Sequence, residues 1–440
     1  MADFKKNNGP RRSNHKYFVK PRVNGISEVF ELRIEKMVQG GEGMARLQDG
    51  RVCFVAGALP GELCKVQLTF KKKDFTKGRV IQILEKSPDR VKPQCPLYGK
   101  CGGCSLQHLA SEKQALYMEQ VERENFRRLA HAELPDDFKI HVGKPWGYRN
   151  RARVVCRSRR NGFPGAKVQF GFREQESNDV ICFDRCPVLT SGLNEFLAGP
   201  AQKIFGDREG TPRELDLNIF DNGGGKISYY HHGMRASEFA QNAVSVVDVC
   251  GKSIQADASV FFQSNLDLLP ELVNAVREAV DEGLNSHTAS NEWLIDLFSG
   301  VGFFAAILQD RFKKITTVER EEGCLVHAKI NLSKPSGEKS AAIENVSAPA
   351  EEWLEKNVVD VPATLIVDPP RTGLPKDALE AIVASSVNRL IYVSCDPVTL
   401  ARDYAKFAQA GFSLIRAEGF AFYPQTPHLE MMFVLNRAGT

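Results

Sequence analysis

Short stretches of alternating hydrophobic and polar residues fill the chain between residues 27 and 88. They cover residues 30–34, 52–55, 63–66 and 80–84, and the dipeptides Gly40-Gly41, Asp49-Gly50 and Pro60-Gly61 separate them. A period of two is typical of strands with one buried face, and such dipeptides favour tight hairpin turns. The pattern therefore predicts a small β-barrel of the OB type over residues 27–88.

The pattern changes after this unit. Residues 108–128 are rich in Gln, Glu and Arg and predict a helix, whereas residues 148–260 hold mostly short strands with helical segments between them. We therefore expect an α+β central domain over residues 89–260. Residues 1–26 precede the barrel and predict a flexible basic arm, which serves either as a solubilising tail or as a weak RNA contact.

From residue 261 to residue 440 the predicted strands and helices alternate, which favours a parallel sheet and a Rossmann-like α/β domain. A strand that starts at Trp293 ends in a glycine turn at Gly300 and Gly302. The next strand ends at Glu319, about 20 residues after the turn, where such sheets hold ribose hydroxyls. S-adenosylmethionine (SAM) fits this turn better than NAD does, because the complete Gly-x-Gly-x-x-Gly pattern is absent.

The charge of the chain restricts how it could bind a nucleic acid. The formal net charge is only +4 over 440 residues, and the basic residues gather at 5–22 and 71–79. Binding would therefore use local patches, in which Lys71, Lys72 and Lys73 neutralise phosphates and Phe75 offers a stacking face. No apolar run of about 18 residues and no secretory signal occurs, so we expect a cytoplasmic protein without a membrane partner.

The eleven cysteines are not distributed like those of a disulfide scaffold. Cys95, Cys101 and Cys104 lie within ten residues, and two glycines between the last two let the backbone fold around one centre. Thiolates suit zinc or an iron–sulfur cluster, and spacing alone leaves both open. Three candidates could supply a fourth ligand, namely Cys156, Cys182 and Cys186, of which Cys186 precedes a proline as many cluster ligands do.

Another cysteine occupies a position suited to nucleophilic chemistry. Cys395 follows the predicted strand at 389–394, and Asp396 and Pro397 are suited to begin a helix. Ligands bind at the carboxyl edge of an open α/β sheet, and a helix N-terminus lowers the pKa of a thiol. The charge of Asp396 acts in the opposite direction.

Five motifs together resemble one known family, the RNA 5-methyluridine methyltransferases, in the order in which that family carries them. The motifs are Phe261-Phe262-Gln263-Ser264-Asn265, Asp296-Leu-Phe-Ser-Gly-Val-Gly302, Asp368-Pro-Pro-Arg371, Val393-Ser-Cys395-Asp-Pro397 and His428-Leu-Glu430. The segment that starts at Gly40 resembles a TRAM domain, a small RNA-binding barrel. With the cysteine cluster, the chain is most similar to the RumA/RlmD type, which modifies 23S ribosomal RNA.

The resemblance implies a role for each matching residue. Cys395 corresponds to the nucleophile and Glu430 to the general base. The SAM-contacting positions correspond to Gln263, Phe298, Glu319 and Asp368. The ligands of a [4Fe-4S] cluster correspond to Cys95, Cys101, Cys104 and Cys186. Two positions depart from the family: Phe303 stands where close relatives carry an asparagine, and Ser264 replaces an apolar residue.

The expected protein is thus a monomeric enzyme that transfers a methyl group from SAM to C5 of a uridine in 23S rRNA and does not act on DNA. A tRNA uracil-C5-methyltransferase is one alternative, although such enzymes generally lack the barrel and the cysteine cluster. An amino methyltransferase would require an aromatic residue in place of Arg371. A non-enzymatic iron–sulfur RNA-binding protein would not require Cys395 and Glu430.

Overall fold

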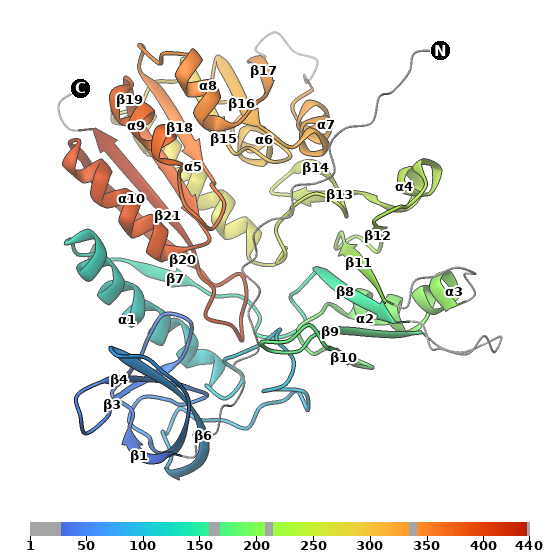
Figure 1. Ribbon diagram of the computed structural model, residues 1–440. Coiled ribbons are helices and arrows are strands. Elements are labelled where there is room, and N and C mark those ends of the chain that lie inside the picture. Colours follow the sequence, from blue (N-terminus) through green and yellow to red (C-terminus); the bar gives the residue numbers. More distant parts are fainter. Residues whose placement is uncertain (1–27, 158–167, 207–213, 334–340, 438–440) are drawn as a thin grey trace.

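The computed structural model describes residues 28–157, 168–206, 214–333 and 341–437 (Figure 1). The predicted basic arm at 1–26, and with it the basic cluster at 5–22, lies outside the described residues. None of the described helices is long and apolar enough to cross a membrane.

The N-terminal unit is a six-stranded sheet that encloses its own hydrophobic core. Its strands are β1 (Val29–Arg33), β2 (Lys36–Met37), β3 (Gly43–Arg46), β4 (Val52–Ala56), β5 (Leu63–Lys71) and β6 (Phe75–Glu85), in the order β1-β5-β6-β4-β3-β2. Alternate residues of β4 and β5, such as Cys53, Val55 and Val66, are fully buried, as a period of two requires. Gly78 has no substitute, because a Cβ there would lie 2.4 Å from Val66 Cγ1.

The central region is built on an antiparallel sheet in the order β10-β9-β8-β11-β12, with a separate β13–β14 hairpin. Its strands are β8 (Arg151–Arg157), β9 (Gln169–Arg173), β10 (Val180–Cys182), β11 (Glu214–Asp221), β12 (Ile227–His231), β13 (Val244–Val249) and β14 (Lys252–Asp257). Its helices are α2 (Ser191–Ala198), α3 (Pro200–Gly206) and α4 (Ala236–Asn242). Figure 1 shows this green region to one side of the molecule, and the blue N-terminal sheet at its lower end.

The C-terminal domain is an eight-stranded sheet with helices on both faces. Its strands are β15 (Trp293–Leu297), β16 (Lys314–Glu319), β17 (Ala342–Ser347), β18 (Ala363–Val367), β19 (Val387–Ser394), β20 (Phe412–Phe420) and β21 (Glu430–Arg437), joined by β7 (Lys139–His141). The order is β17-β16-β15-β18-β19-β21-β20-β7, and the five strands from β17 to β19 are parallel. The predicted alternation of strands and helices therefore forms the parallel sheet that it favours.

The two faces of this sheet carry separate hydrophobic clusters. One cluster contains the apolar faces of α5 (Leu269–Asn285) and α6 (Phe303–Ile307). The other contains those of α8 (Ala350–Lys356), α9 (Lys376–Ala384) and α10 (Pro397–Gln409). The helix α7 (Glu322–Asn331) packs against β14, β16 and β17.

Two elements that precede the central sheet in sequence belong spatially to the C-terminal domain. The predicted helix at 108–128 is α1 (Ser111–Ala130), and it packs on α10, where Phe126 stacks on Tyr404. The strand β7 extends the sheet by pairing in parallel with β20. Residues 111–141 thus lie with the C-terminal domain, although the sequence pattern places them in the central domain.

Candidate active site

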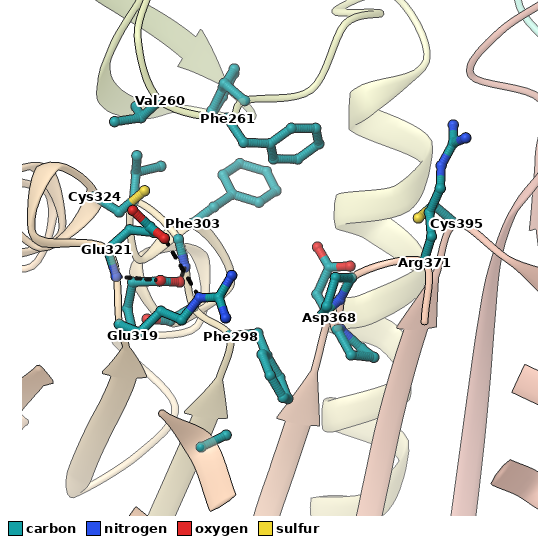
Figure 2. Close-up of a pocket in the computed structure, with 18 of the residues that line it drawn as sticks. Val260, Phe261, Phe298, Phe303, Glu319, Glu321, Cys324, Asp368, Arg371 and Cys395 are labelled. Atoms are coloured by element: carbon teal, nitrogen blue, oxygen red, sulfur yellow. Dashed lines mark hydrogen bonds and ion pairs between the residues drawn. The ribbon is translucent and has the colours of Figure 1, made fainter. Parts of the chain in front are cut away.

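A cavity of about 960 Å³ opens at the carboxyl ends of β15, β16, β18 and β19. Six of the residues predicted to be functional line it: Gln263, Phe298, Glu319, Asp368, Cys395 and Glu430. Figure 2 shows Phe298 and Glu319 on one side, Cys395 and Arg371 on the other, and Asp368 between them. The cavity thus has two halves, as expected for a site that joins a cofactor to a reacting base.

The first half is organised by the turn after β15. Phe298, Gly300 and Gly302 all have positive φ angles, of 59°, 54° and 72°. Phe298 is the unusual member, because a side chain is rarely tolerated in this conformation. Glu319 fixes the turn: its Oε2 accepts a hydrogen bond from Gly300 N at 2.9 Å, and its Oε1 accepts one from Glu321 N at 2.8 Å.

Phe303, one of the two departures from the family pattern, forms part of the cavity wall. Its ring contacts that of Phe262 edge-on, with the ring centroids 5.7 Å apart. Phe262 directly precedes Gln263, so the aromatic pair packs the turn after β15 against the segment at 259–263. The other departure, Ser264, is buried and forms a hydrogen bond with Tyr423.

A buried hydrogen bond between Asp257 and His327 holds the opposite wall of this half. Asp257 accepts a hydrogen bond from Val260 N at 3.1 Å and contacts His327 Nε2 of α7 at 2.7 Å. Burial would raise the pKa of Asp257, but the hydrogen bonds from His327 and Ser259 outweigh it and keep the pKa below its ordinary value. A charged Asp257 therefore anchors the segment that carries Gln263.

Two carboxyl groups deep in the site are disfavoured as anions. Burial raises the pKa of Asp296 to about 8, even though its Oδ2 accepts a hydrogen bond from Ala305 N at 3.1 Å. Burial likewise raises the pKa of Asp368 to about 7. Both groups would be stabilised as anions by a bound cation.

Cys395 lies between β19 and α10, as predicted. Asp396 caps the helix by accepting a hydrogen bond from Thr399 N at 3.0 Å, and Pro397 is the first helical residue. The sequence left the direction of the thiol pKa open, between the lowering effect of the helix N-terminus and the opposing charge of Asp396. Burial raises the pKa of Cys395 to about 12, and the charges of Glu430 and Asp368, rather than that of Asp396, add to this effect.

Arg371 opposes that increase, both by its charge and by a hydrogen bond to the Cys395 thiol. The sequence analysis gave this residue no role, although it directly follows the Asp-Pro-Pro motif. Figure 2 shows its side chain beside Cys395. Arg371 is therefore the cation that favours the thiolate.

Glu430 is the first residue of β21 and is 5% exposed. Its pKa is raised well above the ordinary value by burial and by Asp368, and Arg371 again opposes the shift. His428 also lines the cavity, and its pKa is lowered by burial and by the charges of Arg371 and Arg149. A carboxyl group with a raised pKa next to a thiol is suited to exchange protons near neutral pH.

The cysteines of the predicted cluster lie outside this cavity. Burial raises the pKa of Cys104 to about 11, and the nearby thiols of Cys186, Cys101 and Cys95 add to the shift. Of the three candidates for the fourth position, Cys186 is thus the one beside the others, whereas Cys156 is buried in the core of the central sheet. Across the described parts of the chain, however, no group of three or more Cys, His, Asp or Glu side chains is arranged to hold a metal ion.

Comparison with known proteins identifies two regions of the chain. Residues 238–438 match the model of the tRNA (Uracil-5-)-methyltransferase family, and residues 26–81 match that of the TRAM domain. An uncharacterised RNA methyltransferase of Thermosynechococcus vestitus is 30% identical, and the alignment covers 92% of this chain and 97% of that protein. The 23S rRNA (uracil(1939)-C(5))-methyltransferase of Shewanella sediminis is 29% identical, with 94% and 98% covered.

A solved structure shares the whole architecture. The tRNA (uracil-54, C5)-methyltransferase of Pyrococcus abyssi, determined in complex with S-adenosyl-L-homocysteine, superposes with a TM-score of 0.65 at 20% identity. The superposition covers 92% of this chain and all of that one. Together with the near-complete alignment at 30% identity, these matches establish that the chain belongs to the SAM-dependent RNA (uracil-5-)-methyltransferase family and carries a TRAM domain at its N-terminal end.

Proposed function

We propose that this protein methylates C5 of a uridine in 23S rRNA through a covalent adduct between Cys395 and C6 of the base. The observation that carries the proposal is the convergence of a thiol, a cation and a buried carboxyl group, Cys395, Arg371 and Glu430, at one end of the cavity. Full-length relatives named as 23S rRNA (uracil(1939)-C(5))-methyltransferases support the choice of RNA. The Pyrococcus abyssi enzyme keeps tRNA as the alternative.

The chemistry begins at C6 of the uracil ring, because C5 alone is a poor nucleophile. The Cys395 thiolate forms a bond to C6, and the electron pair of the C5–C6 double bond moves onto the ring as an enolate. Bound SAM supplies the electrophilic methyl group that C5 attacks. Glu430 then removes the proton from C5, the double bond re-forms, and the bond between sulfur and C6 breaks to free the thiolate.

The Cys395 thiol must lose its proton before attack. We propose that this proton leaves to solvent, favoured by the charge and the hydrogen bond of Arg371, so that Glu430 remains free to take the C5 proton later. Arg371 stabilises the thiolate that results. Gln263, Phe298, Glu319 and Asp368 are proposed to hold SAM, with Asp368 facing the positive end of the cofactor.

The target uridine must leave its stack to reach a cavity of this kind, so an unpaired or flipped base is the proposed substrate. We propose that the TRAM domain contributes RNA contacts through the exposed Lys72 and the half-buried Phe75, whose ammonium nitrogen and ring centroid are 5.6 Å apart. The enzyme is proposed to act as a cytoplasmic monomer.

The proximity of Cys95, Cys101, Cys104 and Cys186 supports a [4Fe-4S] cluster as the resident group of the central domain. Methyl transfer needs no electrons, so the cluster would hold the surrounding loops in the shape that binds RNA. The site of Cys186 before Pro187 is consistent with this assignment.

The substrate can be identified directly. Purified protein is incubated with tritiated-methyl SAM and separate pools of unmodified 23S rRNA and tRNA, and the labelled nucleosides are analysed. We expect label as 5-methyluridine in the 23S rRNA alone. Label in tRNA alone would preserve the chemistry and refute the proposed substrate.

Replacing the nucleophile should abolish the reaction without removing the cofactor site. For Cys395→Ala we expect methyl transfer to fall by about 10³-fold or more, because no other thiol lines the reacting half. SAM affinity, measured by calorimetry, should stay within about twofold of the wild-type value. The exposed Cys250 provides the matched control, Cys250→Ala, which should retain full activity. Methylation by the Cys395 variant would refute the adduct mechanism.

The Asp368→Asn variant should bind SAM more weakly and unfold at a higher temperature than the wild-type protein. Because burial raises the pKa of Asp368 to about 7, the folded protein holds a proton there that the unfolded chain releases above pH 4. The contribution of this carboxyl group to stability is thus lost as the pH rises from about 4 to 7. The uncharged variant should exceed the wild-type Tm by roughly 2–4 °C at pH 8 and by less at pH 5, and should bind SAM about tenfold more weakly.

The exposed Asp360 supplies the control for this comparison, since Asp360→Asn should change neither property. A Tm difference that does not grow with pH would show that Asp368 is already ionised in the free protein. Unchanged SAM affinity would remove Asp368 from the cofactor site.

The proposed cluster has its own signature. Cys101→Ser should lose the brown chromophore and the bound iron and bind RNA more weakly, whereas Cys182→Ser, at a cysteine outside the group, should keep all three properties. Absorption spectra, iron analysis and RNA titration measure them. Normal RNA affinity in a cluster-free Cys101→Ser protein would contradict the proposed role.

A further inference from the structure

The loop that joins β20 to β21, residues 421–429, contributes several lining residues to the half of the cavity that contains Cys395 and Glu430. Tyr423, His428 and Leu429 line the cavity, and the residue that follows the loop is Glu430. The position of the Glu430 carboxyl group therefore depends on how this loop is held.

Gln425 lies at the middle of the loop, is 1% exposed and does not line the cavity. Two hydrogen bonds join it to Gln114 of α1, one through its side-chain oxygen and one through its backbone N–H. Gln114 Nε2 donates to Gln425 Oε1 at 3.0 Å, and Gln425 N donates to Gln114 Oε1 at 3.0 Å. Gln425 Nε2 also donates to Ser111 Oγ at 3.0 Å. Every polar atom of this side chain is thus used for contacts with the start of α1.

The backbone of Gln425 is tied to the cysteine-bearing segment. Its carbonyl oxygen accepts hydrogen bonds from Ser105 N at 3.0 Å and Leu106 N at 2.9 Å, and these residues directly follow Cys104. The φ angle of Gln425 is +70°, in the left-handed region that favours glycine. A glutamine is retained in a conformation that costs free energy, which is expected when its side chain contributes compensating contacts.

Gln114 also binds the segment that leads from Cys104 into α1. It is 4% exposed, and its Nε2 also contacts the carbonyl oxygens of Leu106 and Leu109, at 3.3 and 3.2 Å. One buried amide therefore binds both the apex of the catalytic loop and the segment that leads from the cysteines into α1. Buried networks of this kind are rigid when all of their donors and acceptors are satisfied.

Two further side-chain hydrogen bonds hold the part of the loop that precedes Gln425. Tyr148 donates from its hydroxyl to the Pro424 carbonyl oxygen at 3.0 Å, and Asn265 Nδ2 donates to the Phe422 carbonyl oxygen at 3.1 Å. Both bonds lie on the β20 side of Gln425. On the other side, Thr426 Oγ1 donates to the Tyr423 carbonyl oxygen at 2.6 Å and accepts from His428 N at 3.3 Å. These residues are thus bonded within the loop, which Gln425 joins to α1.

We propose that Gln425 is a positioning residue that holds Glu430 in register with the reacting base by fastening the loop at 421–429 to α1 and to the segment after Cys104. The proposal rests on the function proposed above. Through this fastening, the fold of the cysteine-bearing segment controls the proton-abstraction step, although no cysteine of that segment touches the reacting atoms.

The test separates proton abstraction from the earlier steps. Adduct formation requires Cys395, whereas release of the product requires Glu430 to take the C5 proton. A Glu430→Gln protein should therefore trap RNA in a complex that survives denaturing electrophoresis. Gln425→Ala should trap the same complex and slow the release of methylated RNA by about 10- to 100-fold, while SAM affinity stays within about twofold.

Four further variants sharpen the comparison. Gln114→Ala should behave like Gln425→Ala, and the double variant should be no slower than either single variant, because both changes remove the hydrogen bond between the two side-chain amides. Gln425→Gly relieves the positive φ angle, so it should fold at least as well as Gln425→Ala and still trap the complex. The exposed Gln409, at the far end of α10, provides the control Gln409→Ala, which should turn over normally.

The outcomes are distinct. Normal product release by Gln425→Ala or by Gln425→Gly would overturn the positioning role. A parallel loss of SAM affinity and activity without a trapped complex would also overturn it, because that result indicates a general folding defect. Absence of methylation by the wild-type protein would instead overturn the proposed function, and the inference with it.

Discussion

The burial of several ionisable groups at one edge of a sheet is the constraint on which the rest of this structure depends. Asp368, Cys395 and Glu430 share a cavity in which each raises the pKa of a neighbour. Arg371 is the cation that lowers the pKa of the thiol. In the free protein, burial therefore favours the protonated forms of these groups, and a positively charged cofactor would favour the anions.

The surrounding elements can be understood as supports for that edge. Glu319 joins the glycine turn, through Gly300 N, to the end of β16, through Glu321 N, and the hydrogen bond between Asp257 and His327 holds the segment that leads to Gln263. Asp403 of α10 is buried, with 2% exposed. It accepts hydrogen bonds from Leu374 N at 2.9 Å and from the Tyr392 hydroxyl at 2.7 Å. The bond to Leu374 anchors the end of the loop that carries Arg371. None of these supports needs to touch the substrate.

The sequence predicted the elements whose signals are local. Alternation of hydrophobic residues located the strands of the N-terminal unit, and the Asp396-Pro397 pair located the start of α10, because capping depends on neighbours in the chain. The resemblance brought together Gln263, Phe298, Glu319, Asp368, Cys395 and Glu430, which the structure places around one cavity. It could not assign a direction to the pKa of Cys395, because burial and the charge of Glu430 arise from residues distant in sequence. For the same reason Gln425 and Gln114, which are 311 residues apart, carried no signal.

The pairing of β7 with β20 has a consequence for how the molecule comes into existence. During synthesis β7 emerges long before β20, its hydrogen-bonding partner, and the entire central region is made between them. The catalytic sheet therefore cannot acquire this edge until β20 has been synthesised. Contacts between such distant segments close large loops and form late. In terms of biogenesis, the central region behaves as an insertion within the catalytic domain, which must be made before the two strands of this edge can meet.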